Sequence, residues 1–178
     1  MRKQQREAIL ALLEETYMGT ETALNYSTPF ELLVAVIMSA QCTDERVNKI
    51  TARIFPKYNT PEKMGALSQE QLEEEIRDCG LFRSKAKNLL ATCKMLTEEY
   101  NSVIPDTVEE LMKLPGVCKK TANVVASIVY KVPAIAVDTH VFRVSHRLGL
   151  AKGDDPLAVE KELQKAIPKN KWSDAHQW

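Results

Sequence analysis

Two residues of this chain have types and positions suited to covalent chemistry, Lys120 and Asp138. Lys120 stands near the start of a predicted helix, where the positive end of the macrodipole favours a neutral amine, which is a nucleophile. Asp138 stands at the N-cap of the next predicted helix, where a carboxylate stays ionised and can act as a base or stabilise positive charge. The pair predicts a lysine that attacks an electrophilic carbon.

The residues before Lys120 are suited to binding phosphate. Pro115-Gly116 forms a turn that opens onto the backbone N–H groups of the predicted helix. Such groups, together with the helix dipole, bind anions. The turn and the lysine together indicate a phosphate-bearing polymer as the substrate.

The net charge argues against a nucleic-acid protein, but the distribution of charge does not. Lys+Arg and Asp+Glu number 24 each, so the formal net charge is zero, whereas backbone binding depends on charge neutralisation. The acidic residues gather in the segment 70–75, which we expect to be a solvated face. Basic residues gather near Lys120, and local fields steer a ligand more than totals do.

The four cysteines, at positions 42, 79, 93 and 118, form no CxxC pair, so we expect free thiols and no metal site among them. The chain has no run of about 18 apolar residues that could span a membrane. Its N-terminus is charged and lacks an apolar signal region, so we expect a cytoplasmic location.

Helical patterns cover almost the whole chain and predict an all-α fold. Capping boxes open two of the helices, Thr28 with Glu31 and Ser68 with Gln71. The short apolar run 134–137 is too isolated for a sheet and is expected to be a buried connector. The expected helices cover 2–15, 29–40, 43–55, a short stretch from 60, 68–80, 82–100, 107–114, 119–130, 138–148, 157–167 and a segment from 172.

Four motifs in one order resemble those of the helix-hairpin-helix DNA glycosylases, most closely the endonuclease III group. They read LPGVCKKTA at 114–122, VDTHVFR at 137–143, SAQCTD at 39–44 and GLFRSKA at 80–86. The resemblance covers nearly the whole chain. It implies two helical lobes with a DNA-binding cleft between them: 21–131, containing the hairpin at 107–130, and 1–20 with 132–178.

The resemblance implies a base-excision repair glycosylase with abasic-site (AP) lyase activity. It would flip an oxidised pyrimidine out of duplex DNA, as a monomer associated with the nucleoid. Lys120 would attack C1′ of the sugar, expel the base and form a Schiff base, and β-elimination would nick the strand. Asp138 would assist the lysine and stabilise the cationic sugar.

The resemblance also implies DNA contacts. Gln41 would fill the gap left by the flipped base, and Leu81 would wedge into the opposite strand, which recovers part of the flipping energy. Backbone N–H groups of the hairpin would hold a phosphate, with a monovalent cation as a further expected ligand there. The residues concerned at the hairpin are Gly116, Cys118 and Lys119. Arg143 would steady Asp138 or touch the DNA backbone.

The chain departs from the family pattern in two places. Cys118 replaces the second hairpin glycine, so a Cβ crowds the phosphate or cation; its thiol, at a helix N-terminus, is either reactive or an inert replacement. The family also continues into a loop that holds a 4Fe-4S cluster with four cysteines. No such loop follows Trp178, so the cluster ligands are absent from this chain.

Other interpretations remain open. A helix-hairpin-helix module could bind DNA without turnover. An adenine-removing glycosylase would lack Lys120 and carry a catalytic Glu in an earlier helix, where this chain has only Glu31 in its capping box. Gln41 could simply cap a helix C-terminus, and Leu81 could be an ordinary core residue.

Overall fold

The computed structural model describes residues 1–17, 22–175 and 178, and these form helices and connecting loops without a strand. The all-α prediction is confirmed. None of the described helices combines the length and apolar character needed to cross a membrane. The contacts between residues divide the chain into a central unit, Ala23–Val125, and a terminal unit, Met1–Thr22 with Ala126–Trp178. The predicted lobe boundary at 20–21 lies outside the described residues.

The central unit is organised around a helix that is buried on all sides, α2 (Pro29–Met38). The predicted capping box opens it: Thr28 Oγ1 accepts from Glu31 N at 3.2 Å, and the Glu31 carboxylate accepts from Thr28 N at 3.0 Å. This local exchange satisfies two N–H groups that the first turn would leave unpaired. The prediction of a buried central helix is therefore confirmed.

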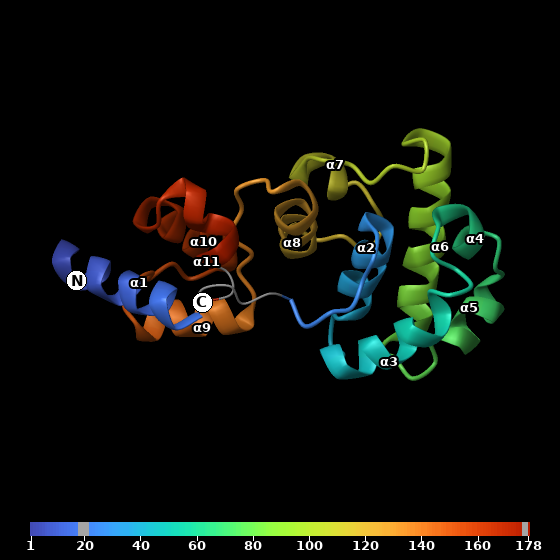
Figure 1. Cartoon of the computed structure of the whole chain (residues 1–178), viewed down its shortest axis with the longest axis horizontal. Helices are drawn as coiled ribbons and strands as arrows, with labels where there is room; N and C mark the ends of the chain where they lie inside the picture. Colours follow the sequence, from blue (N-terminus) through green and yellow to red (C-terminus); the bar gives the residue numbers. More distant parts are fainter. Residues whose placement is uncertain (18–21, 176–177) are drawn as a thin grey trace. The chain divides into compact units, whose positions relative to one another are not determined.

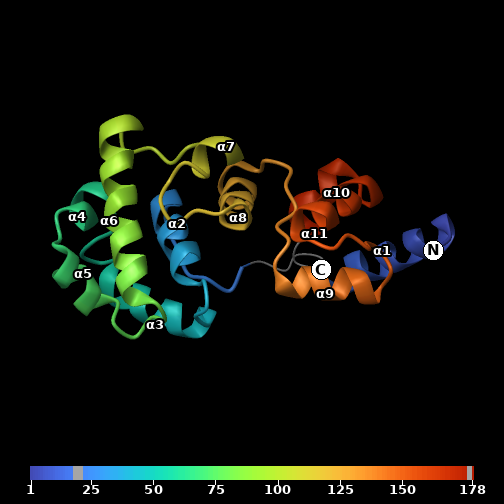
Figure 2. The same cartoon turned by 180° about the vertical axis from the view of Figure 1, so that it is seen from behind.

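Two other long helices of the central unit pack against α2. These are α3 (Asp44–Ile54) and α6 (Phe82–Glu99). The short helices α4 (Pro61–Gly65) and α5 (Gln69–Glu75) lie along α6, as both views show (Figures 1 and 2). The helical hairpin completes the unit with α7 (Val108–Leu111) and the first turns of α8 (Lys119–Tyr130).

The acidic helix ends earlier than predicted. We expected it to reach Gly80, but α5 ends at Glu75, and Ile76 leaves the helical conformation. The Arg53 guanidinium donates a hydrogen bond to the Glu75 carbonyl oxygen at 2.7 Å and so satisfies one terminal carbonyl. Residues 77–80 then form a turn that buries Cys79, a tertiary contact that the sequence pattern does not reveal.

The terminal unit contains α1 (Lys3–Tyr17), α9 (Thr139–Arg147), α10 (Pro156–Ala166), a 3₁₀ turn (Lys169–Lys171) and α11 (Trp172–Ala175). Its core combines residues of α10 with the buried connector 134–137, which has no regular secondary structure, as predicted. The side chains of this core are Ile135, Val137, Ala151, Val159, Leu163 and Ile167.

Candidate active site

Lys120 lies exposed in the first turn of α8, after a hairpin turn that contacts α6. The Thr92 hydroxyl on α6 donates to the Pro115 carbonyl oxygen at 2.9 Å. Gly116 has a φ of +78°, which favours glycine, and a Cβ there would lie 3.0 Å from the Asn88 side chain. The turn is therefore fixed against α6 and sets the position at which α8 begins.

Cys118 is the N-cap residue of α8, and its thiol is perturbed. Partial burial raises its pKa, but hydrogen bonds from Thr121 Oγ1 and from the backbone N–H groups of Thr121 and Lys120 outweigh this effect. The net result is a pKa below the ordinary value for a thiol, because these donors stabilise the thiolate. The Cys118 N–H also stabilises the thiolate, and it is one of the hairpin N–H groups predicted to face a phosphate.

Asp138 is the N-cap of α9, as predicted. Its Oδ1 atom accepts a hydrogen bond from Val141 N at 2.8 Å, and the residue is half-buried. Arg143 is exposed on the same helix, where its Nη2 atom lies 3.1 Å from Nδ1 of His140. Lys120 belongs to the central unit and Asp138 to the terminal unit, so their pairing stays a prediction.

Gln41 and Leu81, the two residues expected to enter the duplex, share an unusual backbone conformation. Their φ angles are +53° and +59°, and both residues are exposed, Leu81 to 57%. Left-handed backbone costs a side chain about 1–2 kcal/mol per residue. The two residues also come from adjoining loops, since a Cβ at Gly80 would lie 2.8 Å from the Gln41 carbonyl oxygen.

The simpler interpretations of these positions are disfavoured. The C-cap of α2 is Ser39, whose backbone N–H bonds to Ala35 and Val36, so Gln41 does not have that role. Leu81 is too exposed to be a core residue. Glu31 is committed to its capping box and also accepts from Ser27 N at 2.7 Å, which leaves it no catalytic role.

Sequence reasoning missed Lys85, a lysine that is only 5% exposed. Its Nζ atom donates to the carbonyl oxygens of Met38 and Ala40, at 2.8 and 2.5 Å, and to Cys79 Sγ at 3.3 Å. A signal was present in the sequence, because Lys85 shares the helical spacing of the buried residues Leu89 and Leu96 on α6.

The described residues do not fit an iron–sulfur cluster. Across 1–17, 22–175 and 178, no three His, Cys, Asp or Glu side chains converge on a metal position. Cys79 and Cys93 are buried, Cys118 is exposed and all are free thiols, as is Cys42.

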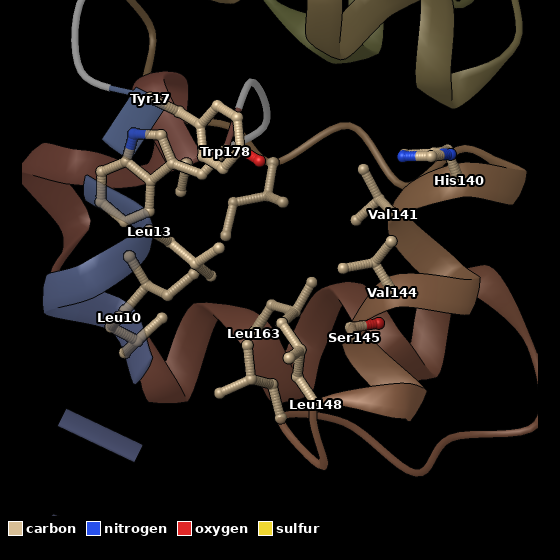
Figure 3. A pocket seen from close by; sticks show the side chains of 14 residues that line it. Leu10, Leu13, Tyr17, His140, Val141, Val144, Ser145, Leu148, Leu163 and Trp178 are labelled. Carbon is tan, nitrogen blue, oxygen red and sulfur yellow. The ribbon is translucent and has the colours of Figure 1, made fainter. Parts of the chain in front are cut away.

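A pocket of about 250 Å³ lies within the terminal unit (Figure 3). Apolar side chains of α1 and α9 face it, among them Leu10, Leu13, Val141 and Val144, and Trp178 also lines it. None of the predicted catalytic or DNA-contacting residues lines this pocket. We therefore assign it no part in the chemistry.

Comparison with known proteins identifies the class. Residues 34–169 match the family described as HhH-GPD superfamily base excision DNA repair protein. The chain is 49% identical to endonuclease III of Bacillus subtilis over 97% of its length and 79% of that protein. It is 45% identical to endonuclease III of Escherichia coli K12, covering all of this chain and 84% of that protein.

Solved structures agree. A trapped endonuclease III–DNA covalent intermediate matches with a TM-score of 0.95 and 51% identity, over 99% of this chain and 84% of that one. A thermostable thymine-DNA glycosylase, 19% identical, has a TM-score of 0.83 over 98% of this chain and 83% of that one, and so shares the fold.

The chain therefore belongs to the HhH-GPD superfamily of base excision DNA repair proteins, and within it to the endonuclease III group. Membership of this group confirms the predicted enzyme class, a DNA glycosylase with AP lyase activity. Nothing in these matches favours the non-catalytic binding module.

Proposed function

We propose that Lys120 and Asp138 carry the glycosylase and lyase reactions, and that the substrate is duplex DNA containing an oxidised pyrimidine. The observation that carries the proposal is the position of Lys120. It is exposed on the first turn of a helix that follows a Pro-Gly turn, and this turn accepts a hydrogen bond from Thr92 and packs closely against Asn88. A nucleophile gains most when its surroundings fix it before the substrate arrives.

The reaction begins at C1′ of the flipped nucleotide. Lys120 Nζ forms a bond to C1′ and loses a proton, while the glycosidic bond breaks and the base leaves with that electron pair and takes up a proton. Opening of the sugar ring gives the imine. Asp138, as a carboxylate, stabilises the positive charge that develops on the sugar.

Strand cleavage follows from the imine. The imine acidifies the C2′ hydrogen, and its loss expels the phosphate from C3′ by β-elimination. Water then hydrolyses the remaining imine and restores the Lys120 amine. This sequence uses only this chain's residues, the DNA and water, and it requires the Asp138 carboxylate near Lys120 when DNA is bound.

The remaining site residues bind and distort DNA in this proposal. N–H groups at Gly116, Cys118 and Lys119 face a phosphate and fix the register without reading sequence. Gln41 fills the gap in the stack and Leu81 enters the opposite strand, while Arg143 on α9 contacts the backbone. The adjoining, exposed and left-handed loops of Gln41 and Leu81 support this assignment. The monovalent cation at the hairpin and the 4Fe-4S cluster stay predictions from the family.

Borohydride trapping tests the proposal. A duplex with a single abasic site is incubated with the protein and borohydride, which reduces an imine to a stable protein–DNA adduct. We expect the parent to form the adduct, Lys120→Ala to form none, and Lys94→Ala, which changes an exposed lysine on α6, to match the parent. Binding without any adduct supports the non-catalytic module, and an undiminished adduct with Lys120→Ala overturns the lysine mechanism.

A further inference from the structure

Lys85 connects the two loops that carry Gln41 and Leu81. It lies in the first turns of α6, where its backbone N–H donates to the Leu81 carbonyl oxygen at 3.0 Å. Its side chain crosses to the other loop and donates to the Ala40 carbonyl oxygen at 2.5 Å. That oxygen belongs to the peptide group that leads into Gln41, so a single residue contacts the backbone beside each of the two residues.

The contacts of Lys85 account for the whole donor capacity of its side chain. An ammonium group has three hydrogens, and the Nζ atom has three acceptors: Met38 O, Ala40 O and Cys79 Sγ. Met38 is the last residue of α2, where terminal carbonyls lack helical partners and the dipole favours a cation. Burial of a lysine is tolerable only with such complete pairing.

Two further contacts tie the loops together. Cys79 Sγ donates to the Met38 carbonyl oxygen at 3.3 Å, from the turn that precedes Leu81. Gly80 approaches so closely that a Cβ would lie 2.8 Å from Gln41 O, and this glycine is not in the positive-φ region. Its small size therefore serves the approach of the loops rather than a backbone conformation.

We propose that Lys85 is a positioning residue that holds the Gln41 and Leu81 loops as one rigid element for opening the duplex. The inference rests on the proposed function, because it needs both residues to enter DNA. Without the lysine, the Ala40 carbonyl loses this donor and the Met38 carbonyl keeps only the Cys79 thiol, so the two loops are no longer held firmly together. Simultaneous insertion into the two strands then fails, although Lys120 and its hairpin are untouched.

The test compares duplex with single-stranded DNA that contains an abasic site, since an unpaired strand needs no opening. We expect Lys85→Met, which keeps the length and removes the donors, to lower kcat/KM on duplex by about 100-fold. Borohydride adduct formation on the single strand stays at the parent level. With 2-aminopurine opposite a tetrahydrofuran site, the rise in fluorescence that reports unstacking is lost.

A second loop variant and a control variant complete the test. Gly80→Ala separates the same loops without touching the lysine, so it reproduces the duplex-specific loss even where Lys85→Met fails to fold. Thr51→Val changes a buried polar residue of the same unit, 1% exposed, and leaves both substrates unaffected. Equal loss on duplex and single strand, or no loss with either loop variant, overturns the inference. Absence of adduct from the parent on both substrates refutes the proposed function instead.

Discussion

The Sγ atom of Cys118 lies 3.5 Å from Oγ1 of Thr121, on the first turn of the helix that carries Lys120. The thiol thus occupies the N-cap position, where Ser, Thr, Asp or Asn is more usual. Its hydrogen bonds with this turn stabilise the thiolate and lower the pKa. This contact has two consequences that can be measured separately, one for thiol reactivity and one for DNA affinity.

Cys118 is expected to be alkylated before the buried Cys79 and Cys93. Its pKa is below the ordinary value, so the thiolate is populated at lower pH than in the unfolded chain. Burial instead raises the pKa of Cys79, and raises that of Cys93 to about 12, so both stay protonated. Mass spectrometry after a short exposure to iodoacetamide identifies the modified residue.

The pH dependence of the alkylation rate tests the direction of the pKa shift of Cys118. The rate of Cys118 alkylation rises as pH passes the folded-state pKa, so its midpoint lies below that of the same peptide in urea. Cys118→Ser removes the fast phase and serves as the control. A midpoint at or above that of the unfolded chain contradicts the hydrogen-bonded thiolate.

Cys118→Gly is expected to strengthen DNA binding. The substitution removes the Cβ and the thiol beside the hairpin N–H groups that are predicted to face the phosphate, and it frees the N–H at position 118 for that contact. Glycine is an acceptable N-cap, so stability falls by only a few tenths of a kcal/mol, about 0.3. Fluorescence anisotropy with a duplex containing a tetrahydrofuran site measures the affinity, and unchanged or weaker binding argues that no phosphate lies there.

The starts of the helices were the part of this fold that the sequence predicted best. Thr28, Ser68, Thr107, Asp138 and Asp155 all cap helices as their spacing indicates, since capping is an exchange between residues three apart. The buried α2 and the connector 134–137 follow equally from apolar runs. These features depend on local pattern alone.

Features that depend on residues far apart in the chain could not be predicted from the sequence. The Glu75 carbonyl at the end of α5 accepts a hydrogen bond from Arg53, 22 residues away in sequence, and Lys85 bonds to carbonyls more than 40 residues away. Gln and Leu give no sign of left-handed backbone in a sequence. The roles of Gln41 and Leu81 came from the family resemblance, and the structure adds that their loops adjoin.

Asp138→Asn is expected to separate the capping role from the catalytic one. Asn caps a helix about as well as Asp, so the free energy of unfolding changes by less than about 0.5 kcal/mol. Loss of the carboxylate charge lowers the single-turnover rate on an abasic duplex by about 100-fold. Quenched-flow kinetics and urea unfolding measure the two effects.

Asp155→Asn is the matched control for that variant. Asp155 caps α10 through Ala158 N at 2.8 Å, the same distance as Asp138 to Val141 N. Both variants should therefore unfold alike, while only Asp138→Asn is slow. If the two variants react at the same rate, Asp138 is a capping residue only.

Replacing Gln41 or Leu81 by glycine is expected to stabilise the folded protein but to lower its activity on duplex DNA. Glycine removes the left-handed strain, and after allowance for the more flexible unfolded chain the gain is about 0.5–1 kcal/mol. The inserted side chain is lost, so kcat/KM on duplex falls while adduct formation on single strands persists. Asn101→Gly is the control: Asn101 also has positive φ, +53°, and is exposed in the turn after α6, but Asn adopts this conformation at little cost, so stability and activity both stay near the parent. A Leu81→Gly enzyme that keeps full activity on duplex would show that the Leu81 side chain is not needed to open the DNA.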